Sequence, residues 1–108
     1  MQALGRLKPG KMNKSESAYA DHLEALKKAG NLHSYQFEAI KFRLADNTFY
    51  SPDFLVISAN MFVEIHEFKG FWQDDARVKI KVAAALYPFF RFVAVTKNKS
   101  GYHYEDFE

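Results

Sequence analysis

Two acids and a lysine on neighbouring predicted strands are the side chains of this sequence best suited to chemistry. They are Asp53, in Pro52-Asp53, and Glu67 and Lys69, in Glu67-Phe68-Lys69. Two carboxylates with open coordination positions suit Mg²⁺ or Mn²⁺, which keep several waters and bind phosphate oxygens. We therefore expect a site for phosphodiester hydrolysis that uses Mg²⁺ or Mn²⁺ as its cofactor.

Each member of this group has its own expected role. Asp53 and Glu67 would hold the metal, and the backbone carbonyl of Phe68 would supply a further oxygen ligand. A metal held there stabilises charge on the phosphate and lowers the pKa of a water molecule. Lys69 would orient that water or stabilise the developing charge. A simple ion pair between Lys69 and either acid is the structural alternative.

Alternation along the predicted strand 61–69 decides which acid belongs to the group. Successive side chains of a strand point to opposite faces, so Glu67 and Lys69 share one face and Glu64 and His66 share the other. His66 is therefore expected to pack or to pair with Glu64 rather than to act at the site. A metal site made by Glu64 and His66 is the competing interpretation.

The pattern of apolar residues predicts the elements that carry these side chains. A capped amphipathic helix precedes three strands joined by short turns, and a second helix leads to a strand parallel to an earlier one. The expected segments are a helix over about 15–29, strands over 34–44, 48–57 and 61–69, a helix over 75–87, a strand over 89–96 and an edge segment over 102–107. The first of these strands is expected to have a bulge near Ala39-Ile40, and Pro52 to interrupt the second as at an edge or a bulge. The order αβββαβ predicts an α/β domain with a mixed central sheet.

Composition and length are typical of one small domain with an arm. The 108 residues suffice for a single core, and 48% of them are apolar. Residues 1–13 are predicted to form a flexible basic arm and residues 14–108 the domain. The lack of cysteine excludes a disulfide framework and a thiolate zinc site. No stretch has the length of a membrane span, and we expect a cytoplasmic protein.

The motifs and the order of elements together resemble the PD-(D/E)xK nuclease superfamily. Its signature is Pro-Asp followed by acid-x-Lys on the next strand, and its restriction-endonuclease-like core has the order αβββαβ. Over about 15–96, with the continuation Gly70-Phe71-Trp72 and a lysine-rich helix ending at Tyr87-Pro88, the chain resembles a small phage-encoded family. Its members are described as Holliday-junction-resolvase-like endonucleases, which implies a phage or prophage protein acting in a bacterial cytoplasm.

The resemblance also implies further site residues. Members of the superfamily often add an acid from the first helix, here Glu16, which shares the inward stripe of that helix. A capping box with Asn13 is the structural alternative. A basic residue of the second helix often completes the site, although helix salt bridges would also use such residues. The candidates for nucleic-acid binding, drawn from this helix and the basic N-terminal segment, are Lys79, Lys81, Arg77 and Lys14.

The expected partner is DNA, including branched DNA. A single small domain leaves little room for a module that reads bases, so recognition of shape and phosphates is favoured. A junction with two symmetric cleavage points implies a homodimer, for which the eleven Phe and six Tyr would supply an interface. Nicking by a monomer is the alternative. The competing function is a non-catalytic nucleic-acid-binding module that retains the nuclease fold.

Overall fold

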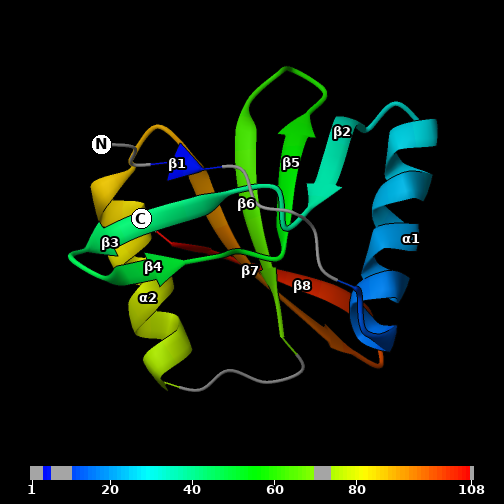
Figure 1. Cartoon of the computed structure of the whole chain (residues 1–108). Helices are drawn as coiled ribbons and strands as arrows, with labels where there is room; N and C mark the ends of the chain where they lie inside the picture. Colours follow the sequence, from blue (N-terminus) through cyan, green and yellow to red (C-terminus); the bar gives the residue numbers. More distant parts are fainter. Residues whose placement is uncertain (1–3, 6–10, 70–73, 108) are drawn as a thin grey trace.

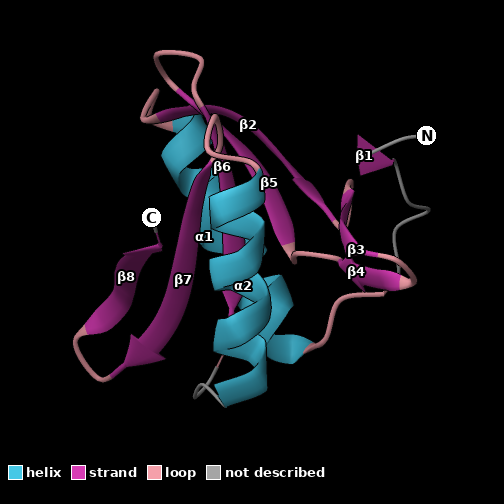
Figure 2. Ribbon diagram, turned by 90° about the vertical axis from the view of Figure 1, so that its left-hand side faces the viewer, coloured by secondary structure: helices cyan, strands magenta, loops and turns pink. Residues whose placement is uncertain are grey.

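A mixed sheet of five strands, with one helix on each face, organises the structure (Figures 1 and 2). The computed structural model describes residues 4–5, 11–69 and 74–107. The sheet has the order β2-β5-β6-β7-β8, with β6 and β7 parallel and the other neighbours antiparallel. Its strands are β2 (Leu32–Phe37), β5 (Phe54–Ser58), β6 (Val63–Phe68), β7 (Arg91–Asn98) and β8 (Gly101–Phe107). The predicted α/β class and mixed sheet are confirmed.

Helix α1 (Lys14–Lys28) begins and ends where its sequence signals place it. The Asn13 side chain accepts the Glu16 amide, and the Glu16 side chain accepts the Asn13 amide, so the predicted capping box is present. Tyr19 and Leu23 are buried against the sheet. Gly30 follows the helix with φ of +82°, a value that glycine adopts without a steric penalty.

Helix α2 (Asp74–Leu86) and strand β7 also lie close to their predicted positions. The inward face of α2 is buried at Ile80, Ala83 and Ala84, and Tyr87 is buried just beyond its end. Strand β7 is parallel to β6, as a helical crossover requires. The predicted continuation Gly70-Phe71-Trp72 lies outside the described residues. No helix of the described segments is long and apolar enough to cross a membrane.

The predicted strands 34–44 and 48–57 are each broken in the middle, which corrects the sequence prediction. The first divides into β2 and β3 (Lys41–Ala45), and the second into β4 (Thr48–Tyr50) and β5. Strand β2 pairs with β5 in the main sheet, whereas β3 pairs with β4 in a second sheet. Glu38, with φ of +47°, ends β2, and buried Pro52, which has no N–H, interrupts the other strand. One long hairpin therefore bends from one sheet into another.

The second sheet has the order β1-β3-β4 and lies beside α2 (Figure 1). Its strand β1 (Leu4–Gly5) pairs with β3. Part of the segment predicted to be a flexible arm thus forms a short strand. Residues 1–3 and 6–10 of that segment lie outside the described residues.

The main sheet separates two apolar cores. The core on the α1 side includes Tyr19, Leu23, Phe54, Val93 and Val95. The core on the α2 side includes Phe42, Ile65, Ile80, Tyr87 and Phe92. Phe42 of β3 is fully buried, and its ring lies 4.9 Å from that of Tyr87 and 5.3 Å from that of Phe92, measured between centroids. This side chain attaches the second sheet to the rest of the protein.

Replacing Phe42 with alanine is expected to lower the free energy of unfolding by about 3–5 kcal/mol, because a buried aromatic ring leaves a cavity. Denaturant unfolding followed by circular dichroism measures the loss. The matched control is Phe62→Ala, since the Phe62 residue is 66% exposed and should cost less than about 1 kcal/mol. Equal losses in the two variants would show that Phe42 does not hold the second sheet in place.

Candidate active site

Asp53 and Glu67 meet where β6 extends beyond the start of β5. The pairing of these strands ends with Phe54 opposite His66, so the next residues of β6 lie level with the bend of the hairpin. There the Oδ2 atom of Asp53 accepts the Phe68 N–H at 2.8 Å. In turn, the Oε1 atom of Glu67 accepts the Asp53 N–H at 3.2 Å. This reciprocal exchange places two carboxylates side by side, as the sequence predicts.

Tyr50 and Lys69 complete the surroundings of Glu67. The Tyr50 hydroxyl donates to Oε1 of Glu67 at 3.1 Å, and the Lys69 Nζ atom lies 3.5 Å from Oε2. The Lys69 side chain is 43% exposed, whereas that of Glu67 is only 9% exposed. Lys69 therefore stands at the rim of the site. No periodic pattern in the sequence singles out Tyr50, because Pro52 interrupts the alternation that would link it to Asp53.

Burial raises the pKa of both carboxyl groups. Asp53 is 8% exposed and Glu67 is 7% exposed. Removal from water and the neighbouring charge of Glu67 raise the pKa of Asp53 to about 8, although the Phe68 N–H and Lys69 act in the opposite direction. Burial likewise raises the pKa of Glu67, opposed chiefly by Lys69 and by the Tyr50 hydrogen bond. Without a cation, this pair retains a proton at neutral pH.

The chemistry of this donor set fits a hard divalent cation. Within the described chain, Oδ1 of Asp53 accepts no hydrogen bond. The Lys69 N–H bonds to β7, so the N–H and C=O of Phe68 point the other way, toward the side that β5 leaves open. The described residues contain no group of three or more His, Cys, Asp or Glu able to hold a metal. Two carboxylates, a carbonyl and water are nevertheless a usual set for Mg²⁺.

Glu16 caps helix α1, and its charge also influences the carboxyl group of Asp53. Its Oε1 atom accepts the Asn13 N–H at 3.0 Å in the capping box. Its negative charge also helps to raise the pKa of Asp53, so the first turn of α1 lies within electrostatic reach of the site. The capping alternative is therefore confirmed. A direct part for Glu16 in the reaction stays a prediction.

Lys79 lies on the same side of the sheet as the carboxylates. Its Nζ atom is 3.4 Å from the carbonyl oxygen of Phe49, the residue before Tyr50. Lys81 is exposed, as a residue that contacts a phosphate must be. The helix salt bridge that would be the structural alternative, with Asp75 four residues before Lys79, involves a side chain outside the described residues.

Arg77 and Lys14, the other predicted contacts with nucleic acid, lie elsewhere. The Arg77 guanidinium forms an ion pair with Glu105 at 2.6 Å and lies over the ring of Phe107 at 5.2 Å. A helix salt bridge of Arg77 with Asp74, three residues before it, would involve a side chain outside the described residues. Lys14 is exposed at the start of α1. The four cations therefore do not form one continuous patch, and Arg77 already has an anionic partner.

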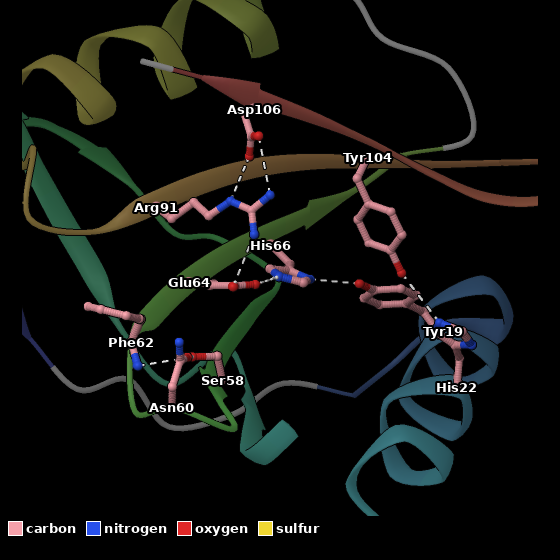
Figure 3. Close-up of polar contacts among 10 residues, drawn as sticks. All are labelled: Tyr19, His22, Ser58, Asn60, Phe62, Glu64, His66, Arg91, Tyr104 and Asp106. Carbon is pink, nitrogen blue, oxygen red and sulfur yellow. Dashed lines mark hydrogen bonds and ion pairs between the residues drawn. The ribbon is translucent and has the colours of Figure 1, made fainter. Parts of the chain in front are cut away.

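His66 belongs to a chain of hydrogen bonds on the opposite face of the sheet (Figure 3). Its Nδ1 atom is 2.6 Å from the Tyr19 hydroxyl, and its Nε2 atom is 2.9 Å from Glu64. Glu64 also accepts from Arg91 at 3.1 Å, and Arg91 pairs with Asp106 at 2.7 Å. The predicted separation of His66 from the carboxylate pair is confirmed. Because both ring nitrogens form hydrogen bonds, His66 has no nitrogen left to coordinate the metal of the competing site.

Comparison of the chain with known protein families, curated proteins and solved structures finds no match. The resemblance to the PD-(D/E)xK superfamily therefore stays a prediction. The evidence for a function is therefore the site itself and the order of the elements that form it.

Asp53→Asn is expected to stabilise the metal-free protein at neutral and alkaline pH. Asp53 binds a proton more tightly in the folded protein, with a pKa of about 8, than in the unfolded chain, where its pKa is about 3.9. The free energy of unfolding should therefore fall as the pH rises from about 4 to about 8. Asparagine removes the charge and still accepts the Phe68 N–H, so we expect a gain of roughly 2 kcal/mol at pH 8 and a flatter pH dependence.

Urea unfolding in EDTA over this pH range measures the effect. Asp46→Asn is the matched control, since that side chain is 91% exposed and the same substitution there should leave the pH dependence unchanged. A wild-type stability that rises with pH between about 4 and 8 would contradict the raised pKa of Asp53.

Proposed function

We propose that this protein is a metal-dependent endodeoxyribonuclease of the PD-(D/E)xK superfamily, with Asp53, Glu67 and Lys69 as its catalytic residues. The observation that carries this proposal is the pair of adjacent buried carboxylates with a lysine ammonium 3.5 Å away. Two adjacent buried carboxyl groups with raised pKa values cost folding free energy, which the hydrogen bonds they accept offset only in part. Such costs are typical of functional sites.

The order of elements supports the same assignment. Helix α1, the bent hairpin, strand β6, helix α2 and strand β7 follow one another in the order αβββαβ when each arm of the hairpin counts as one strand. Strands β6 and β7 are central and parallel, and the acid-x-Lys segment lies at the end of β6. This order of elements supports the proposal of a restriction-endonuclease-like core.

The residues of the site divide the expected chemistry among them. When bound, a divalent cation supplies positive charge beside the scissile phosphate and makes nearby water more acidic. Asp53 and Glu67 would hold it, together with the carbonyl of Phe68. Tyr50 fixes one oxygen of Glu67, so that the other oxygen faces Lys69. From the rim, Lys69 donates to the attacking water or to a phosphate oxygen and stabilises the charge that develops there.

The substrate expected on these grounds is DNA, bound through its backbone. The Lys79 ammonium contacts the backbone carbonyl of Phe49 on the side of the sheet that carries the carboxylates. Lys81 and Lys14 are exposed. A preference for branched DNA, a homodimer that cuts a junction at two symmetric points, and action in the bacterial cytoplasm as a phage protein all follow from the family resemblance.

Lys69→Ala is expected to lower the rate of DNA cleavage at least about 100-fold, because it removes a donor aimed at charge that develops in the transition state. The assay follows nicking of supercoiled plasmid and cleavage of synthetic four-way junctions in Mg²⁺ or Mn²⁺. Lys27→Ala makes the same change of charge at the far end of α1 and should leave the rate unaltered. Failure of the wild type to cut either substrate with either metal, or equal activity of Lys69→Ala, would refute the nuclease assignment.

Mg²⁺ or Mn²⁺ is expected to raise the Tm of the wild type but not that of Asp53→Ala, because only the intact pair offers two carboxylate ligands. Metal binding must displace the proton that the pair retains, so the affinity should be higher at pH 8 than at pH 6. Scanning calorimetry gives the Tm, and titration calorimetry in two buffers counts the released protons. Asp46→Ala, at an exposed position, is the control. An equal rise in Tm for the wild type and Asp53→Ala would show that the metal binds elsewhere.

A further inference from the structure

A hollow of about 560 Å³ lies between the first turn of α1 and the turn that joins β7 to β8. Figure 1 shows these two segments side by side at the lower right. Among the described residues, three lysines and no acid line this hollow. Its principal lining residues are Lys14, Lys97, Lys99, Ser15, Phe68 and Tyr102.

The hollow adjoins the carboxylate pair through a single residue. The Phe68 side chain lines the hollow, while its N–H binds the Asp53 carboxylate. Its neighbours Glu67 and Lys69 point to the opposite face of the sheet. The hollow and the carboxylates therefore lie on either side of the end of β6. A chain of phosphates that passes over this end would meet both.

Hydrogen bonds within the β7–β8 turn order the backbone from which Lys99 projects, and a ring contact positions Lys97 at the end of β7. The Oδ1 atom of Asn98 accepts the Ser100 N–H at 2.8 Å and lies 2.8 Å from Nε2 of His103. The Lys97 ammonium lies over the ring of Tyr102, 5.3 Å from its centroid. Because the turn is ordered by its own hydrogen bonds, less conformational entropy would be lost when an anion binds.

The charges of this hollow are not neutralised within the described part of the chain. Lys14, Lys97 and Lys99 take part in no ion pair there. Two further hollows in the described part of the chain differ, since each includes Arg91 together with its partner Glu64. The hollow beside Phe68 thus presents a local excess of positive charge, which attracts anions.

We propose that this hollow binds the phosphate backbone of the nucleic acid next to the bond that is cut. Lysine ammonium groups neutralise phosphates without reading bases, which suits a protein with little room for a base-reading module. The Ser15 hydroxyl offers a further donor. The placement next to the cut bond rests on the proposed function, whereas the binding of phosphates by the three lysines does not. With Lys79 on the other face, the nucleic acid would straddle the end of β6.

The test compares the double variant Lys97→Ala/Lys99→Ala with Lys27→Ala/Lys28→Ala, which removes the same charge from the last turn of α1. Anisotropy of a short fluorescein-labelled DNA duplex gives the Kd in EDTA, where no cleavage occurs, over a series of salt concentrations. The variant of the hollow should weaken binding about tenfold and reduce the salt slope by about two units, one for each lysine. Lys97→Arg/Lys99→Arg keeps the charge and should restore both values.

Equal weakening by the two alanine variants would overturn the proposal, as would competition by inorganic phosphate as strong as that by DNA. The latter would identify a site for free phosphate. Thermal unfolding of each variant verifies that the fold is intact, and the arginine variant covers any loss of the contact between Lys97 and Tyr102. Because binding is measured without metal, a failure here is distinct from a failure of the nuclease assignment, which concerns cleavage alone.

Discussion

The amide of Phe68 lies on a central strand beyond the point where the neighbouring strand begins, and a buried amide needs an acceptor. The hairpin bends at Pro52, so the Asp53 carboxylate takes the position that a backbone carbonyl of β5 would otherwise occupy. The amide of Asp53 is satisfied in turn by Glu67. The pairing of the two acids is therefore part of how the sheet completes its hydrogen bonds. A change to either acid affects the backbone as well as the chemistry.

Burying these two carboxyl groups side by side lowers the stability of the fold, although the proposed site requires them there. Each carboxylate is buried beside the other. The pKa of Asp53 is raised because ionising both groups costs free energy in this environment. Tyr50, the Phe68 amide and Lys69 offset part of that cost. The remainder must be supplied by the two apolar cores on either side of the sheet. A small domain can maintain such a site because its central strands are fully covered elsewhere.

Local patterns in the sequence predict the elements and the face on which each acid lies, because periodicity and caps are local properties. Asn13 with Glu16 indicates the start of α1, and alternation along β6 separates Glu67 from His66. The division of the hairpin between two sheets was not predictable, since Pro52 indicates an interruption but not the direction of the bend. The contribution of Tyr50 depends on that bend and has no local signal. Lys79 was a candidate from the sequence, but its contact with the Phe49 carbonyl depends on how α2 packs against the second sheet, which has no local signal.

The polar chain from Tyr19 through His66, Glu64 and Arg91 to Asp106 has a consequence for assembly. It joins α1, β6, β7 and β8, and so connects segments near the two ends of the described sequence (Figure 3). Its Tyr19–His66 end is buried, whereas the side chains of Arg91 and Asp106 are 53% and 51% exposed, so the specificity of the chain comes mainly from the directional hydrogen bonds of the buried end. These polar contacts therefore specify how the four elements are arranged relative to one another. The position of the first helix is therefore connected, through β6 and β7, to that of the C-terminal strand.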